Sequence, residues 1–180
     1  MEPMKYLAYM ASLINGIPHD VYIATLIVFC LGAAILIGIR GWRKGLRSAT
    51  GLLLCEYIFL LYCSTVIFRS TAKERAFDFT PFWSYSNPDL VVENVMNAVA
   101  FVPVGVLLGI ATSRWKSGWL VAMIVGMGIS VSIETMQYFM KRGFSEVDDV
   151  MHNTLGCLIG FLIVAIFNEI WSLYKRFSTN

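Results

Sequence analysis

The stretch Val21-Tyr-Ile-Ala-Thr-Leu-Ile-Val-Phe-Cys-Leu-Gly-Ala-Ala-Ile-Leu-Ile-Gly-Ile39 carries no charged side chain over its whole length. A helix of about 20 apolar residues spans the hydrocarbon core of a bilayer, so this stretch predicts a transmembrane segment. Backbone exposed to lipid must satisfy its own hydrogen bonds, which favours a helix over a strand.

Further apolar runs of similar length follow along the chain. They are residues 50–68, 95–112, 119–140 and 151–171. The predicted fold class is therefore all-α, a polytopic transmembrane helical bundle of about five spans. Residues 3–17 are apolar but too short to span, and we expect a short N-terminal interfacial or re-entrant helix there. The gaps between the runs leave no room for a soluble domain, so we expect residues 1–180 to form a single membrane domain.

The composition agrees with a membrane protein. Of the 180 residues, 57% are hydrophobic and 14% are charged, whereas about a quarter of the residues of a soluble domain are charged. The mean hydropathy is +0.66. The net charge of +2 gives no basic field for nucleic acid, so membrane lipids are the expected partners. The cysteines lack metal-ligand spacing, and we expect them to be buried hydrophobic side chains; they are Cys30, Cys55, Cys63 and Cys157.

The basic residues predict an orientation. The short loop Arg40-Gly-Trp-Arg-Lys-Gly-Leu-Arg47 has four basic residues and no acid, which is typical of a cytoplasmic loop. On the same side lie Arg114 and Lys116 in a later loop, and Lys175 and Arg176 in the tail. We therefore expect a multi-pass protein with its N-terminus outside and its C-terminus in the cytoplasm.

With this topology, the strongly polar groups near the membrane gather at the outer ends of the spans, with the exception of Glu56. They are Arg69, Asn94, Asn97, Glu134, Gln137, Arg142, Asp148, Asp149 and Asn153. Polar groups at membrane depth are costly unless paired or hydrated, and they mark function by default. The simplest arrangement packs the third, fourth and fifth spans around an outward-facing polar pocket.

Small residues predict which spans pack closely. Gly156 and Gly160 form a G-x-x-x-G pair in the fifth span, and Gly105 and Gly109 repeat the spacing in the third. Such pairs let two membrane helices approach closely. Pro103 lies inside the third span and frees a backbone carbonyl there.

The carboxyl groups leave several interpretations open. Glu134 and Asp149 are candidate catalytic residues as an acid–base pair. Alternatively they form a structural network with Arg69 or Arg142. Asp149 also precedes the fifth span and is expected to cap its helix.

No metal and no cofactor are expected. Hard oxygen ligands are present, and His152 adds a nitrogen, but neither an H-E-x-x-H spacing nor a cysteine-based spacing occurs. The candidate oxygen ligands are Asp148, Asp149, Glu134 and Gln137.

Several short motifs follow one another in order. They are Tyr62…Arg69, Thr80-Pro81-Phe82, Asn97-x-x-x-Phe101-x-Pro103-x-Gly105, Glu134-x-x-Gln137, Arg142, and Asp149-Val150-x-x-Asn153-x-x-Gly156. In this order and spacing, the chain resembles the VanZ-like family of bacterial membrane proteins over about residues 62–160. The family is named for a protein associated with teicoplanin resistance.

The resemblance implies a location in the bacterial cell membrane and reduced susceptibility to teicoplanin-type (lipo)glycopeptide antibiotics. We expect the outward-facing pocket to bind or shield a lipid-linked envelope component, either a lipid-linked cell-wall precursor or a lipoglycopeptide. The expected binding residues are Arg69, Asn97, Glu134, Gln137, Arg142, Asp148, Asp149 and Asn153.

Two other classes of function remain open. The first is an intramembrane enzyme that modifies an envelope lipid by Glu134 and Asp149 acid–base chemistry. The second is a small transporter or flippase, which is disfavoured because the inner halves of the last three spans are apolar.

Overall fold

The computed structural model describes residues 4, 11, 15–74, 76–112 and 117–178. Within these residues, five helices are long and apolar enough to cross a membrane. They are α2 (His19–Arg40), α3 (Trp42–Tyr62) with the π-helical turn η1 (Cys63–Ile67), α4 (Pro88–Thr112), α5 (Gly118–Met140) and α6 (Val147–Ser178). The predicted all-α helical bundle is confirmed. The helix expected at residues 3–17 lies almost wholly outside the described residues.

The helix bounds differ from the predicted spans mainly for α3, α4 and α6, and α3 begins at Trp42 rather than at residue 50. Helix α4 begins at Pro88 rather than at residue 95, and α6 runs from Val147 to Ser178 rather than over 151–171. Hydropathy marks only the part of a helix that lipid surrounds, whereas the helix itself continues as long as its backbone bonds close. The polar first turns of these helices were therefore not included in the predicted spans.

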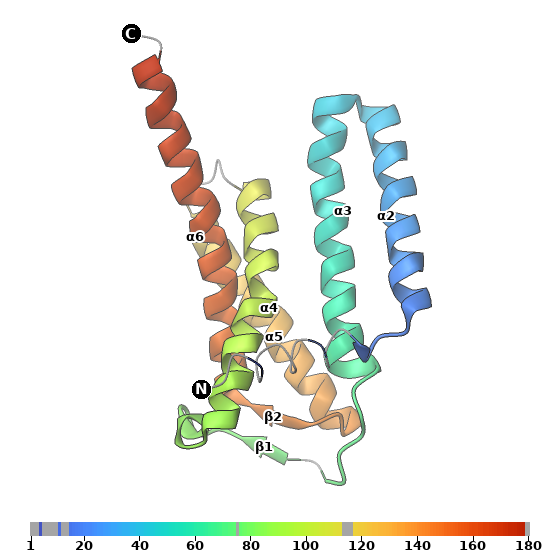
Figure 1. Cartoon of the computed structure of the whole chain (residues 1–180), viewed down its shortest axis with the longest axis vertical. Helices are drawn as coiled ribbons and strands as arrows, with labels where there is room; N and C mark the ends of the chain where they lie inside the picture. The colour runs from blue at the N-terminus through green and yellow to red at the C-terminus, as the bar shows by residue number, and fades with distance from the viewer. Residues whose placement is uncertain (1–3, 5–10, 12–14, 75, 113–116, 179–180) are drawn as a thin grey trace.

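Two groups of helices make up the bundle (Figure 1). Helices α4, α5 and α6 pack against one another, and the α2–α3 hairpin stands beside them. The turn between α2 and α3 and the C-terminal end of α6 lie at one end of the molecule. The last turn of α3, the start of α4, the end of α5 and the start of α6 lie at the other end.

Close packing of α4 on α6 depends on the predicted glycines. A Cβ atom added to Gly105 would overlap the backbone of Cys157, and one added to Gly156 would overlap the carbonyl group of Ala98. Gly160 lies equally close to the backbone of Val102. Because the backbones touch directly, the close approach predicted from the G-x-x-x-G spacing is present between these two helices.

The buried apolar core lies where α3, α4, α5 and α6 meet. Its members are Leu61, Val66, Phe101, Val104, Leu108, Ala122, Ile133, Cys157 and Phe161. Cys63 and Cys157 are buried as expected, but the expectation of burial is wrong for Cys30 and Cys55, which are exposed on the helix surface.

A short sheet interrupts the helical pattern at the polar end. Strand β1 (Ala76–Asp78) pairs in parallel with β2 (Phe144–Glu146), and Phe77 lies opposite Ser145. These strands were not predicted, because three residues are too few for an alternating pattern. The pairing ties the long segment between α3 and α4 to the connection between α5 and α6. A 3-10 turn, η2 (Trp83–Ser86), completes this end.

Candidate functional site

A small polar cavity lies at the end of the bundle that carries the sheet. Its volume is about 30 Å³. Its lining includes Ser64 and Thr65 together with six of the eight expected binding residues. These six are Arg69, Asn97, Glu134, Gln137, Asp149 and Asn153. Side chains from four helical segments far apart in the sequence thus share one cavity.

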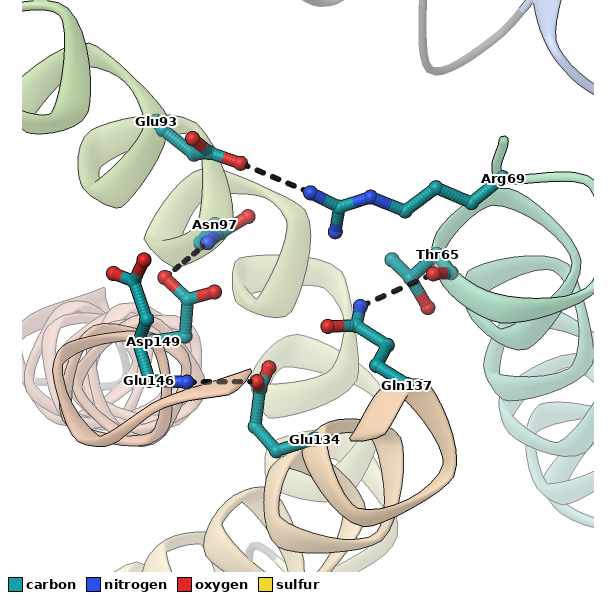
Figure 2. Close-up of polar contacts among 8 residues, drawn as sticks. All are labelled: Thr65, Arg69, Glu93, Asn97, Glu134, Gln137, Glu146 and Asp149. Atoms are coloured by element: carbon teal, nitrogen blue, oxygen red, sulfur yellow. Dashed lines mark hydrogen bonds and ion pairs between the residues drawn. The ribbon is translucent and has the colours of Figure 1, made fainter. Parts of the chain in front are cut away.

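Asp149 is held in the first turn of α6 by a partner on α4. Its Oδ1 atom accepts a hydrogen bond of 2.7 Å from the side-chain amide of Asn97 (Figure 2). The expectation that Asp149 caps this helix is wrong, because α6 already begins at Val147. A negative charge in the first turn is still favoured by the helix dipole.

Glu134 lies near the end of α5 and is 3% exposed. Its Oε2 atom accepts a hydrogen bond of 3.1 Å from the backbone N–H of Glu146, and its backbone oxygen accepts one of 2.7 Å from the hydroxyl of Ser145. Both partners belong to β2. The short strand therefore fixes the orientation of this carboxyl group.

Gln137 lies one helical turn after Glu134, as the spacing predicts. Its side-chain nitrogen donates a hydrogen bond of 3.1 Å to the backbone oxygen of Thr65 in η1 (Figure 2). The last carbonyl groups of a helix have no partner within the helix, so one of them is available to this amide. Gln137 thereby joins the end of α5 to the end of the α3–η1 helix.

Arg69 and Arg142 lie next to each other at the rim. The Arg69 guanidinium pairs with Glu93 at 3.4 Å and is 33% exposed. Arg142 donates a hydrogen bond to the backbone oxygen of Arg69. Gly143 has a φ of 130°, and a Cβ atom there would lie 3.0 Å from the Arg69 guanidinium carbon. Arg142 thus supports the backbone of Arg69, and it is not among the residues that line the cavity.

The structure places Asp148 away from the cavity. Its carboxyl group is fully buried and accepts hydrogen bonds from the backbone N–H groups of Phe82 and Ser84, at 2.6 and 3.2 Å, and from the Ser84 hydroxyl. The side-chain amide of Asn94 donates a hydrogen bond of 2.7 Å to the Ser84 hydroxyl. These contacts anchor η2 to the starts of α4 and α6, which is a structural task.

Sequence reasoning missed Glu146, Glu93 and Thr65. Burial, then the charges of Asp149 and Glu93, raises the pKa of Glu146 to about 7. The signal for Glu146 was its place close to two aspartates. Its contact with Glu134 depends on how the connection between α5 and α6 folds back on α5, which the sequence does not show. Thr65 contributes a backbone oxygen, which no sequence pattern reveals.

An apolar groove of about 440 Å³ runs along α5 and α6 at the same end. Its lining includes Met123, Met127, Met151, Leu155 and Leu158, with Phe82, Tyr85 and His152 among the other lining residues. One polar contact in the groove is a hydrogen bond of 2.8 Å between the Tyr85 hydroxyl and His152 Nε2. His152 Nδ1 donates to the carbonyl oxygen of Asp148 at 2.6 Å, so in the neutral ring Nε2 accepts from Tyr85.

The structure divides the candidate metal ligands, because Glu134, Gln137 and Asp149 line the polar cavity whereas Asp148 and His152 do not. Asp148 binds η2, and His152 faces the groove. In the described part of the chain, no three His, Cys, Asp or Glu side chains are grouped so that they could hold a metal ion.

These features define a polytopic membrane protein whose helix bundle gathers polar side chains at one end. The family model VanZ/LLP1 matches residues 50–168, and the chain belongs to this family. Protein VanZ of Enterococcus faecium is 26% identical over 96 residues, which cover 53% of this chain and 56% of that protein. The chain thus spans about half the length of this relative. No solved structure matches the chain.

Proposed function

We propose that this chain lowers susceptibility to teicoplanin-type (lipo)glycopeptide antibiotics by binding or shielding a lipid-linked envelope component at the outer face of a bacterial cell membrane. Membership of the VanZ/LLP1 family and the similarity to Protein VanZ support the link to resistance. The observation that carries the binding role is that an apolar groove and a polar cluster share one end of the bundle.

The orientation follows from the basic residues. The loop that begins at Arg40 and the C-terminal end of α6, with Lys175 and Arg176, lie at the end of the bundle opposite the polar cluster. Basic residues collect on the cytoplasmic side. The polar cluster then faces outward, where lipid-linked cell-wall precursors and glycopeptides meet.

The two parts of this end suit an amphipathic ligand. The groove along α5 and α6 presents apolar side chains to a hydrocarbon chain. Arg69 is one-third exposed, and a guanidinium group suits phosphate or carboxylate because it offers two parallel donors. An anionic head group would compete with Glu93 for this side chain.

The size of the polar cavity favours binding over chemistry. A volume of about 30 Å³ admits a water molecule or an ion, but not the head group of an envelope lipid. Such a head group would therefore meet the rim, at Arg69, while Glu134 and Asp149 remain beneath it.

Direct binding to the purified chain in lipid nanodiscs tests this proposal. Teicoplanin and a lipid-linked cell-wall precursor are titrated separately, with vancomycin as the glycopeptide that lacks an acyl chain. We expect one of the first two to bind. Arg69→Gln removes a charged donor and Leu155→Trp fills part of the groove, so each should weaken binding by about tenfold, which is roughly 1.4 kcal/mol. Leu162→Trp is the control, since Leu162 lies on α6 and is not among the residues that line the groove. Binding of neither ligand, or equal affinity in all variants, would contradict the proposal.

A further inference from the structure

Two buried side-chain amides in the polar cavity carry oxygen atoms without partners. Gln137 is 2% exposed and Asn153 is 5% exposed. In the described structure, neither Gln137 Oε1 nor Asn153 Oδ1 has a hydrogen-bond partner. A buried acceptor without a hydrogen-bond partner destabilises the fold by about 1–3 kcal/mol. A ligand that contacts these two oxygens would remove that cost.

The orientation of the Gln137 amide is fixed by its other contact. The backbone oxygen of Thr65 can only accept, so the side-chain nitrogen must face it, at 3.1 Å. The oxygen is then turned toward the side chains of Glu134 and Asp149, as Figure 2 shows. The Asn153 nitrogen is likewise engaged, with the Ser130 hydroxyl at 2.8 Å.

The same cavity contains two carboxyl groups. Glu134 and Asp149 each accept one hydrogen bond from an amide N–H, at 3.1 and 2.7 Å. Arg69 is the basic residue among those that line the cavity, and its guanidinium pairs with Glu93. The lining therefore combines two carboxyl groups with two amide oxygens, and its charge favours a cation.

We infer that this cavity is a binding site for a hard divalent cation of the calcium type, held by side-chain oxygens of Glu134, Gln137, Asp149 and Asn153. A volume of about 30 Å³ accommodates one ion with little water. Calcium accepts irregular sets of carboxylate and amide oxygens, whereas magnesium demands an octahedron and retains several waters. A single water molecule would offer only two donors and would leave the carboxyl charges uncompensated.

The cation has a mechanical consequence. The proposed ligands of the cation lie on α5 and α6. The same cavity is also lined by Thr65, at the end of the α3–η1 helix. A bound ion would hold these segments together and raise the melting temperature of the chain. This inference does not depend on the proposed antibiotic role, because it concerns the purified chain alone.

The test titrates CaCl₂ into the EDTA-treated full chain in detergent and follows binding heat and melting temperature. We expect saturable binding and a higher melting temperature with Ca²⁺ than with EDTA. Asp149→Asn, which keeps an acceptor for Asn97, and Gln137→Met should each weaken Ca²⁺ affinity at least tenfold. Asp78→Asn is the control, since this acid lies in β1 at the same end and outside the lining residues.

Two results would overturn the inference. One is a folded wild-type chain that neither binds Ca²⁺ nor changes its melting temperature, which would leave the cavity to water or a shared proton. The other is an equal response to Mg²⁺ and Ca²⁺ that persists in Asp149→Asn, which would indicate ion binding at the surface only. If Gln137→Met does not give a monodisperse protein, the wild-type titration and Asp149→Asn decide the question.

Discussion

Carboxyl groups crowd the polar end of the molecule, and each is controlled by a different partner. Asn97 holds Asp149, a backbone N–H of β2 holds Glu134, and η2 holds Asp148. Glu146 lies among them without burial as deep as theirs. Its side chain is therefore the one through which the cluster responds most directly to the pH of the surrounding water.

We predict that Glu146→Gln changes how stability depends on pH. Folding raises the pKa of this carboxyl group from 4.5 to about 7. The folded chain then binds more protons between these values, so its free energy of unfolding falls as pH rises from 4.5 to about 7. Glu146→Gln should reduce this fall and be more stable than wild type at pH 8. The gain is on the order of 1 kcal/mol, because solvent screens the half-exposed group.

Denaturant unfolding in detergent at pH 4.5 and pH 8 measures this effect. Glu74→Gln is the control, since this acid is exposed and lies in the connection between α3 and α4. Equal pH dependence in wild type and Glu146→Gln would show that burial and the neighbouring carboxylates do not raise the pKa of Glu146.

Among individual residues, those that share a helix were the easiest to predict from the sequence. Glu134 and Gln137 are three residues apart, and they do line one cavity. Asp148 and Asp149 are adjacent, and sequence alone could not tell that one anchors η2 while the other faces the cavity. That difference depends on how the segment with Ser84 folds back onto Asp148. No local sequence pattern predicts this.

At the scale of elements, the α4–α6 contact organises the site. Glycines at Gly105, Gly156 and Gly160 bring the two backbones into contact, and this places Asn97 within reach of Asp149. In lipid, helices gain little from apolar contact alone, so close packing of backbones matters more than in water. The polar cavity therefore depends on a contact that contains no polar side chain.

We predict that Gly156→Ala strongly destabilises the chain. A Cβ atom there would overlap the Ala98 carbonyl group, so the helices must separate. Overpacking of this kind costs about 1–3 kcal/mol or more. Gly128→Ala is the matched control, because a Cβ atom on this α5 glycine meets nothing within 4 Å and alanine favours helix. Thermal unfolding in detergent measures both; a Gly156→Ala variant as stable as Gly128→Ala would contradict the packing account.

The helices that cross the lipid were predicted well, because their apolar composition reveals them. The elements that depend on tertiary contacts were predicted poorly. Long apolar runs revealed all five spanning helices in the described residues. The strands β1 and β2 were missed because their pairing joins residues about 70 positions apart. Strand β2 orients the carboxyl group of Glu134. The strands that were not predicted therefore help to shape the site.

At the scale of the whole molecule, the two ends of the bundle differ in the charged residues that they carry. Basic residues lie around the α2–α3 turn and the end of α6, and the buried acids lie at the opposite end. This asymmetry carries the proposed orientation, in which the polar cluster faces outward.

We predict that a membrane-impermeant maleimide labels Phe79→Cys in intact cells, while it labels Phe177→Cys only after the cells are permeabilised. Both positions are exposed. Phe79 directly follows β1, and Phe177 lies in the last turn of α6, so they mark opposite ends of the bundle. The background carries Cys30→Ser and Cys55→Ser, because these two native thiols are exposed. The reverse labelling pattern would place the polar cluster in the cytoplasm and remove the basis of the proposed function.

The most direct test of the central claim, that the polar cluster is a functional site, is the minimum inhibitory concentration of teicoplanin in a susceptible Gram-positive host. Wild type, Glu134→Gln, Asp149→Asn and the control Asp78→Asn are expressed at matched membrane levels, with vancomycin as the comparison antibiotic. We predict that wild type and Asp78→Asn raise the teicoplanin value and that the two cavity variants do not. Equal protection by all four chains, or no protection by wild type, would contradict this account.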